Sequence, residues 1–167
     1  NDFQEHKIRL WTSYLRYFGR AGEIDRGTVW RYDSPTTFSY MASNVRIPAQ
    51  LQANDPGYAS PLLWMPLYFG QRGVGEFNST SLFDIAVTYR IPIWKSVEPY
   101  VKLDVFNVLN DDTLVTFNTS ITPDPASPVD EHGLRTGYVK GVNFGRATSA
   151  GNHVTPREYF LAVGIRF

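Results

Sequence analysis

The alternating pattern at the end of the chain constrains the fold most strongly. Between residues 157 and 167, every second residue counted back from the C-terminus is large and apolar: Phe167, Ile165, Val163, Leu161 and Tyr159. The residues between them are small or charged, with the exception of Phe160. A period of two is typical of a β-strand with one apolar face and one polar or crowded face. About ten such residues also match one tilted passage of a strand through a bilayer.

Composition narrows the classes of protein to which the chain can belong. Its 167 residues carry a formal net charge of +0, whereas a nucleic-acid partner normally requires a basic surface, so we expect no nucleic acid. The absence of cysteine excludes thiolate zinc sites, iron–sulfur clusters and disulfides. Aromatic residues make up 15% of the chain, which suits interface girdles, a sugar-stacking surface or a large β core. No apolar run reaches the roughly 18 residues of a transmembrane helix.

Alternation predicts three further strands, at about 4–17, 78–91 and 97–109, besides the one at 157–167. The pattern is weakest in the first of them. The short segment 92–96 begins with a proline, which cannot donate to a sheet ladder and helps to end the preceding strand. We therefore expect a tight turn there and an antiparallel hairpin around it.

The register of this hairpin follows from keeping both apolar sets on one side of the sheet. The strand at 78–91 carries Phe83, Ile85, Val87 and Tyr89 on its apolar face, and the strand at 97–109 carries Val101, Leu103 and Val105. The prediction is that Tyr89 faces Val101, Val87 faces Leu103, and Ile85 faces Val105.

Glycine and proline punctuate two long connections, expected at about 18–77 and 110–156. A short strand or helical turn within the first is expected around 27–32 or 44–52. Structureless segments of this length are unusual in a compact soluble domain but ordinary as outer loops of a large membrane barrel. The predicted fold class is therefore all-β: antiparallel up-and-down strands, about four of them, forming the last part of a transmembrane β-barrel. The short turn and the C-terminus would share the periplasmic side.

Three stretches of the chain resemble a known family. They are Phe77-Asn78 leading into residues 81–89, the segment Val105-Phe106-Asn107-Val108-Leu109-Asn110, and the terminal strand ending in Phe167. Together they are similar to the C-terminal end of a TonB-dependent outer-membrane receptor. The likeness is greatest to the Oar-like group, whose N-terminal part carries a carboxypeptidase-regulatory-like domain. The resemblance covers the strands and little of the loops.

The resemblance implies a 22-stranded barrel filled by a plug and located in the bacterial outer membrane. Such a receptor takes up a scarce ligand, such as an iron chelate, cobalamin, a glycan or a peptide, with energy from the TonB–ExbB–ExbD complex. The partners it implies are outer-membrane lipid, the remaining barrel strands and the plug. Neither enzyme activity nor a cofactor is expected. The chain begins at Asn1 without a signal peptide, so we expect a processed product or fragment that lacks the plug and the TonB box.

The terminal strand also resembles the signal that the barrel-assembly machinery recognises. That signal would consist of Tyr159, Leu161, Val163, Ile165 and Phe167. A strand with a free edge can be captured by strand addition. Plain membrane anchoring is the alternative, and the two roles are compatible.

Charged residues gather on the face expected to line the lumen: Asp84, Arg90, Glu98, Lys102, Asp104, Glu158 and Arg166. Opposite charges on neighbouring strands can pair across a ladder, and Glu98 with Arg166 is the favoured pair. A ligand-binding role for this face is disfavoured because it would also meet the plug. At the periplasmic end, Trp94 and Tyr89 are expected at the membrane interface, with ordinary packing as the alternative. Tyr100 would instead face the lumen.

Aromatic residues of the first long connection are candidates for contact with a ligand or an external partner. The principal candidates are Trp30, Tyr32, Tyr58, Trp64 and Tyr68, and the wider set adds Phe38, Tyr40 and Phe69. Acidic residues are frequent in the second connection, but their spacing lacks the regularity of a calcium loop, and the histidines are isolated. We expect no metal site, and no arrangement of nucleophile and base or phosphate-binding loop occurs.

Two other functional classes remain open on the sequence. One is a soluble β-rich module that stacks carbohydrate on its aromatic side chains. The other is an outer-membrane barrel or adhesin without transport. Periodicity alone does not separate a face that meets lipid from one that packs on a core. A need for detergent would exclude the soluble module, and an upstream plug with a TonB box would separate a transporter from an adhesin.

Overall fold

The computed structural model describes residues 4–53, 57, 59–60, 62–93 and 97–167. The chain divides into two compact units. The sheet unit comprises Gln4–Pro35, Asn78–Val115 and His153–Phe167, and the described part of the loop unit comprises Thr36–Phe77 and Thr116–Asn152. The paired strands of both units are antiparallel, and strands are the predominant regular structure, so the chain is all-β as predicted.

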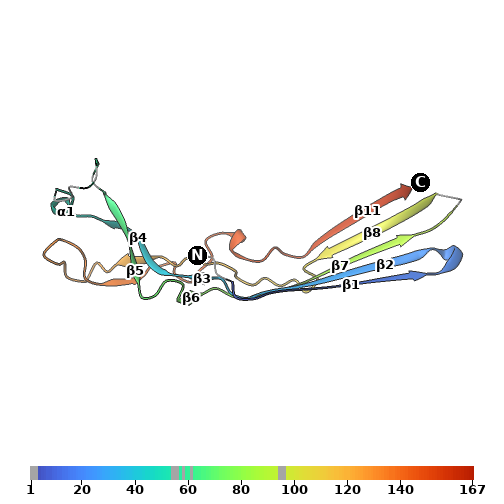
Figure 1. Ribbon diagram of the computed structural model, residues 1–167, viewed down its shortest axis with the longest axis horizontal. Helices are drawn as coiled ribbons and strands as arrows, with labels where there is room; N and C mark the ends of the chain where they lie inside the picture. Colours follow the sequence, from blue (N-terminus) through green and yellow to red (C-terminus); the bar gives the residue numbers. More distant parts are fainter. Residues whose placement is uncertain (1–3, 54–56, 58, 61, 94–96) are drawn as a thin grey trace. The chain divides into compact units, whose positions relative to one another are not determined.

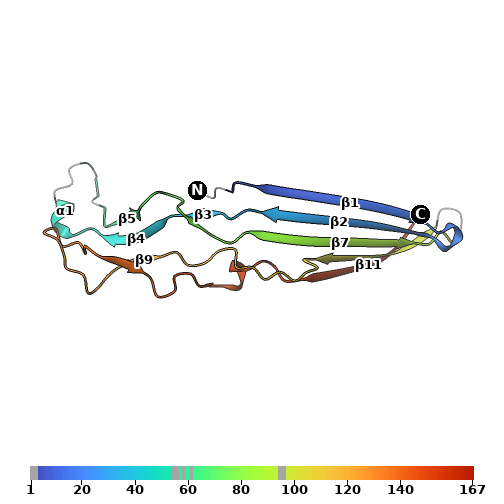
Figure 2. The ribbon, with the colours of Figure 1, turned by 90° about the horizontal axis from the view of Figure 1, so that it is seen from below.

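The sheet unit is a single five-stranded antiparallel sheet (Figures 1 and 2). In spatial order its strands are β1 (Lys7–Tyr17), β2 (Glu23–Asp33), β7 (Thr80–Arg90), β8 (Glu98–Phe106) and β11 (Glu158–Arg166). Each strand pairs with the next one of the sheet along the chain, which is an up-and-down arrangement. β1 and β11 are the outer strands, so within the described residues the sheet is open and does not close into a barrel.

The first long connection was predicted wrongly, because β2 occupies residues 23–33 of the expected 18–77 loop. β2 fills the place between β1 and β7, which gives five strands in place of about four. The alternation of apolar and polar residues cannot be recognised in the sequence of β2, because the polar residues Arg26 and Thr28 lie on the same face as Ile24 and Trp30. The short strand considered at 27–32 lies inside β2. The region considered at 44–52 contains the end of β4 and most of the short helix α1 (Ala49–Ala53).

The other strands of the sheet lie inside the ranges that the alternation indicates. The pairing of β7 with β8 places Tyr89 opposite Val101, Val87 opposite Leu103, and Ile85 opposite Val105, so the predicted register is confirmed. β8 ends at Phe106, earlier than expected, because Asn107 takes a positive φ of 49° and starts a turn.

The connections of the sheet follow a regular order. Residues 18–22, which include the 3-10 turn η1 (Gly19–Ala21), join β1 to β2, and a second short connection joins β7 to β8. Arg166 lies opposite Glu98 at the start of β8, so the chain ends at the same end of the sheet as both short connections (Figure 1). We call this the short-turn end, and the opposite end, from which the long connections leave, the long-loop end. Part of the predicted 92–96 turn lies outside the described residues.

The loop unit contains three two-stranded sheets rather than unstructured loop. β3 (Thr37–Phe38) pairs with β6 (Gly75–Glu76), β4 (Tyr40–Arg46) with β5 (Trp64–Phe69), and β9 (Ile121–Pro123) with β10 (Tyr138–Lys140). A 3-10 turn, η2 (Ala150–Asn152), follows β10.

An aromatic cluster packs inside the loop unit. The ring of Phe38 lies 4.8 Å from Phe77 and 5.4 Å from Phe117, measured between ring centroids. Nearby, Ala42 and Val45 are only 2% and 4% exposed. These contacts give the unit a small core of its own. Across the part of the chain that the structure describes, no helix is long and apolar enough to cross a membrane.

Candidate functional site: the two faces of the sheet

One face of the sheet is mostly apolar, and its polar residues are arginine, threonine and serine. We call it the apolar face; it carries the even-numbered residues of β1 and β2 and the odd-numbered residues of β7, β8 and β11. The registers align these residues in rows across the strands, for example Thr12, Thr28, Ile85, Val105 and Tyr159. A register shift of one residue would move all the side chains of a strand to the other face of the sheet. These continuous registers therefore keep the apolar residues of all five strands on one face.

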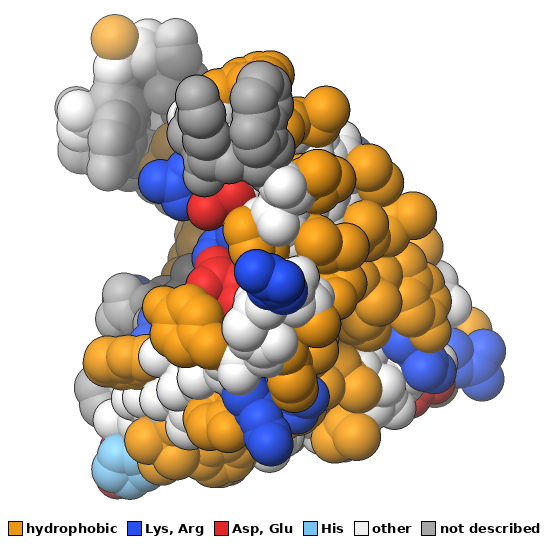
Figure 3. Space-filling view, turned by 90° about the vertical axis from the view of Figure 1, so that its right-hand side faces the viewer, with side chains coloured by type: hydrophobic (Ala, Val, Ile, Leu, Met, Phe, Trp, Pro, Cys, Tyr) orange, Lys and Arg blue, Asp and Glu red, His pale blue; other side chains and the backbone are white. Residues whose placement is uncertain are grey.

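Side chains on the apolar face are exposed on the outer strands β1 and β11 and mostly half-buried on β2 and β7. Leu10 is 57% exposed on β1, and Leu161 and Val163 are 71% and 73% exposed on β11. The buried hydrophobic residues of the described chain are Ala42, Val45 and Val154, and none of them belongs to this sheet. Figure 3, which looks onto the short-turn end, shows hydrophobic side chains gathered over one side of the molecule. Contiguous apolar surface of this kind marks a contact with a membrane or a partner.

The opposite face, which we call the polar face, is held by ion pairs between neighbouring strands. Asp84 on β7 accepts from the Arg31 guanidinium on β2 at 2.7 Å. Near the short-turn end, Arg90 on β7 contacts the carboxylates of Glu23 and, at 3.6 Å, Asp25 on β2. Opposite charges across a ladder stabilise the pairing of the strands that carry them.

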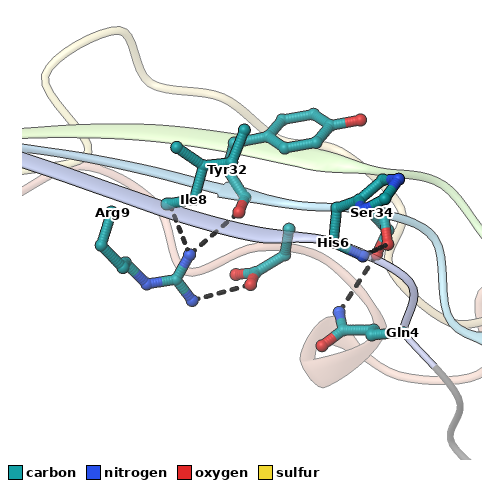
Figure 4. Close-up of polar contacts among 7 residues, drawn as sticks. Gln4, His6, Ile8, Arg9, Tyr32 and Ser34 are labelled. Carbon is teal, nitrogen blue, oxygen red and sulfur yellow. Dashed lines mark hydrogen bonds and ion pairs between the residues drawn. The ribbon is translucent and has the colours of Figure 1, made fainter.

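Arg9 forms the corresponding link between β1 and β2 near the long-loop end (Figure 4). Its guanidinium donates to Asp33 Oδ1 at 2.7 Å and to the carbonyl oxygens of Ile8 and Tyr32 at 2.8 and 2.9 Å. Beyond it, the His6 amide donates to Ser34 Oγ at 3.0 Å. These contacts secure the outer strand β1 by its polar face, although β1 has a neighbour on only one side.

The favoured pair Glu98 and Arg166 lies directly opposite across β8 and β11, but no ion pair joins the two side chains in the described structure. Arg166 is exposed on an outer strand, where an ion pair gains little energy and no single geometry is favoured. On β8 the ion pair that forms is the one between Lys102 and Asp104, at 2.8 Å within the strand. The prediction placed the two residues correctly but was wrong about the contact.

The segment Phe106-Asn107-Val108-Leu109-Asn110 builds a polar junction at the long-loop end. Asn107 is 4% exposed, and its side-chain amide donates to the carbonyl oxygens of Asp111 and Thr155 at 2.8 and 2.9 Å. Its backbone amide donates to Asp84 Oδ1 at 2.9 Å. The junction therefore connects β7, the end of β8 and the approach to β11.

Asn110 completes this junction. It also has a positive φ, of 53°, and its side-chain oxygen accepts from the Arg157 amide at 3.1 Å, one residue before β11. Asparagine tolerates positive φ better than other non-glycine residues. From the sequence this motif indicated only the family resemblance, and its structural role was not predicted. Two asparagines spaced three apart after a strand are the signal that points to it.

The structure separates the candidate ligand-contacting aromatics. Trp30 and Tyr32 lie on β2 and on the apolar face, so their expected position in a loop is wrong. Their rings stack with centroids 6.3 Å apart, and Trp30 Nε1 donates to Ser81 Oγ at 2.9 Å. They stand near the long-loop end of the sheet rather than in a loop.

Trp64 and Tyr68 lie on β5 in the loop unit and are 54% and 44% exposed. The Arg72 guanidinium lies 4.4 Å from the centroid of the Tyr68 ring. Tyr58 lies outside the described residues. The wider set is used in packing: Phe38 and Tyr40 join the aromatic cluster, and Phe69 packs against Tyr138 at 4.9 Å.

The three aromatic residues expected near the short-turn end do not share one position. Tyr89 stands on the apolar face, and its hydroxyl donates to the Ala21 carbonyl in the first short connection. Tyr100 stands on the polar face opposite Gly164, as its register predicts. Trp94 lies outside the described residues.

The residues of the expected assembly signal lie on an outer strand. Tyr159, Leu161, Val163 and Ile165 are at least 57% exposed on β11, and Phe167 is 87% exposed. β11 pairs with β8 on one side only, so its other backbone edge is unpaired within the described sheet. This geometry is compatible with strand addition.

The carboxylates of the second long connection organise turns. Asp111 Oδ1 accepts from the Thr113 hydroxyl at 2.6 Å, and Asp130 Oδ1 accepts from the amides of His132 and Leu134 at 2.9 and 2.8 Å. Within the described residues, no group of three or more His, Asp or Glu side chains is placed to hold a metal ion.

Comparison with known proteins adds no relative. No protein-family model, curated protein or solved structure matches this chain. The two faces of the sheet and its open edges are therefore the features from which a function can be inferred.

Proposed function

We propose that this chain forms the final strands of the barrel wall of an outer-membrane TonB-dependent receptor. The barrel would take up a scarce ligand such as an iron chelate, cobalamin, a glycan or a peptide. The observation that carries the proposal is the contrast between the exposed apolar face and the ion-paired polar face of one continuous sheet. In this role the apolar face meets outer-membrane lipid, and the polar face lines the lumen beside the plug.

The size of the strands supports a membrane position. The five strands are 9 to 11 residues long, which matches a tilted crossing of the hydrocarbon core. The exposed apolar face supports lipid over a soluble core, since no buried hydrophobic residue of the described chain lies on this sheet. The alternation of short and long connections is the asymmetry of periplasmic turns and outer loops.

The open edges support a wall that other strands complete. A strand edge without hydrogen-bond partners is unfavourable in lipid by several kcal/mol per unsatisfied group, as an order of magnitude. β1 would pair with a preceding barrel strand, and β11 would close onto the first strand of the barrel. The exposed alternate residues of β11 and Phe167 would be recognised by the barrel-assembly machinery during insertion.

Transport is the part of the proposal that depends on the motif resemblance. It needs a plug and a TonB box preceding this segment, through which the TonB–ExbB–ExbD complex would act. A gene that encodes an upstream barrel without a plug would indicate a non-transporting barrel or adhesin instead.

The membrane assignment is tested by solubility and folding. The purified chain should require detergent to remain dispersed, and in detergent or lipid it should show strand-rich circular dichroism. A monomer that folds cooperatively in detergent-free buffer contradicts the proposal and supports the soluble carbohydrate-binding module. The same preparation, titrated with soluble oligosaccharides, tests that module directly.

A further inference from the structure

Two arginines stand on the apolar face of the sheet. Arg16 lies near the end of β1 and Arg26 near the start of β2, so both are close to the short-turn end, and both are exposed. The register sets Arg16 opposite Ile24 and Arg26 opposite Tyr14. The two arginines are therefore diagonal neighbours on one face, a separation of about 7–8 Å.

The apolar face offers these arginines no carboxylate. In the registers of the five strands, every Asp and Glu falls on the polar face. Four of the six polar-face cations, Arg9, Arg31, Arg90 and Lys102, each contact a carboxylate, whereas Lys7 and Arg166 form no ion pair in the described structure. Within the described structure Arg16 and Arg26 form no ion pair, and the contact of Arg16 is with the ring of Phe18, at 5.4 Å.

The connection beside the two arginines has a defined conformation. The Phe18 amide donates to the Gly22 carbonyl at 2.8 Å, and the Tyr89 hydroxyl donates to the Ala21 carbonyl. Gly22 has a φ of 105°, and a Cβ there would lie 2.1 Å from the Arg90 carbonyl oxygen, so the connection packs tightly against the end of β7. An ordered connection of this kind holds the arginine-bearing strand ends together.

We propose that Arg16 and Arg26 bind the phosphate group of an anionic phospholipid at the membrane interface. This inference rests on the proposed function, because it requires the apolar face to lie in lipid. An unpaired cation on a lipid-facing strand is unfavourable, and an anionic headgroup neutralises it. The aliphatic stem of arginine covers apolar surface while its guanidinium reaches the interface and donates to phosphate in pairs. Tyr14 and Tyr89 add aromatic rings of the kind found at this depth.

The test compares binding of the chain to two kinds of vesicle, phosphatidylcholine alone and phosphatidylcholine mixed with phosphatidylglycerol. One basic residue near an anionic surface contributes roughly a fivefold preference, so the wild-type chain should prefer the mixed vesicles by about tenfold or more. The R16Q/R26Q variant should lose most of that preference. The matched control R46Q/R146Q removes two exposed arginines of the loop unit and should retain it.

The two proposals fail in different ways. If the wild-type chain does not bind phosphatidylcholine vesicles, the membrane assignment itself fails. If it binds them but R16Q/R26Q keeps the preference, or loses no more than the control, the arginine site is refuted. If inorganic phosphate binds the wild-type chain without vesicles, and R16Q/R26Q abolishes that binding but leaves the vesicle preference unchanged, the site binds free anions and the lipid assignment is wrong.

The same experiment includes a control for whether each variant folds. Equal binding to phosphatidylcholine vesicles and equal circular dichroism show that a variant retains the sheet. The R16K/R26K variant keeps both charges and should retain part of the preference, because lysine binds phosphate as a point charge without the paired geometry. If R16Q/R26Q does not fold, the single variants R16Q and R26Q carry the test, each expected to lose part of the preference.

Discussion

Tyr100 on β8 lies over Gly164 on β11, directly opposite it across the ladder. A Cβ placed on Gly164 would be 2.6 Å from the Tyr100 hydroxyl oxygen and 2.7 Å from the adjoining ring carbon. The ring therefore occupies the space that a side chain at position 164 would need. This contact explains why a glycine stands inside β11, where it would otherwise weaken the strand.

The first prediction is that Gly164→Ala destabilises the sheet by about 1–3 kcal/mol, because the new methyl group forces the Tyr100 ring to move. The measurement is urea unfolding of the chain in detergent micelles, followed by circular dichroism. In the background of Tyr100→Ala the same substitution should be neutral or stabilising, since the ring is gone. Gly151→Ala is the control, because its nearest atom, Ser149 Oγ, is 3.7 Å away. Equal effects of Gly164→Ala in both backgrounds would contradict the proposed overlap.

A second prediction concerns the Asn107 junction. Asn107→Ala should destabilise the chain by about 2–4 kcal/mol, because it removes the buried side-chain amide that donates to the carbonyl groups of Asp111 and Thr155 and places alanine at positive φ. Asn107→Gly accepts the backbone conformation but still loses the side-chain bonds, so its cost should be smaller and should isolate the hydrogen-bond contribution. Chemical denaturation gives both values. Asn143→Ala, at an exposed position, is the matched control. An Asn107→Gly variant as stable as wild type would show that only the backbone conformation matters.

The sequence predicts the central hairpin of the sheet well because two independent constraints agree there. Proline at 92 limits the turn, and the alternation of β7 and β8 leaves one register that keeps both apolar sets together. The pattern fails at β2, where Arg26 and Thr28 interrupt the apolar face and Gly27 weakens the strand signal. An arginine there is compatible with a strand only if its head reaches water or a headgroup, which a hydropathy pattern does not register.

The candidate sites were less predictable than the strands, because they depend on pairings distant in sequence. Glu98 lies opposite Arg166 as predicted, but the two side chains do not form an ion pair. Ion pairs form instead between residues such as Arg31 and Asp84, whose strands are joined by a long connection. Trp30 and Tyr32 were assigned to a loop because β2 was not recognised. The Asn107 junction joins segments separated by 48 residues along the chain, and the two closely spaced asparagines that mark it do not specify that distant partner.

A third prediction separates the two faces of β11 with a single substitution on each. Leu161→Arg places a charge on the apolar face near the middle of β11 and should cost about 2–4 kcal/mol if that face meets lipid. Phe160→Arg places the same charge on the polar face, opposite Asp104, and should cost much less, although it removes the edge-on contact with Phe106. Unfolding in phospholipid bilayers provides the comparison. Equal costs at the two neighbouring positions would contradict a lipid-facing role for the apolar face.

A fourth prediction concerns the ion pair between Arg31 and Asp84, whose side chains are 38% and 14% exposed. A double-mutant cycle with Arg31→Gln and Asp84→Asn should give a coupling energy of about 0.5–1 kcal/mol, because the pair is partly solvated. Asp84→Asn alone should cost more than Arg31→Gln alone, since the Asn107 amide then donates to a neutral amide oxygen, which is a weaker acceptor than the carboxylate. Denaturant unfolding supplies all four values. Equal costs for the two single variants would show that the Asn107 contact adds nothing measurable.

The last prediction follows from the open edges of the sheet. β1 and β11 each have one neighbour, so each presents a row of backbone donors and acceptors without partners in the described sheet. In a bilayer these groups are too costly to leave unpaired, and five strands of 9 to 11 residues leave the sheet open rather than closed around a pore. Planar-bilayer recordings of the isolated chain should therefore show no stable single-channel conductance. A steady, reproducible unit conductance would mean that copies of the chain pair edge to edge into a closed ring. Such a result would contradict the proposal that barrel strands from outside this segment are needed to close the sheet.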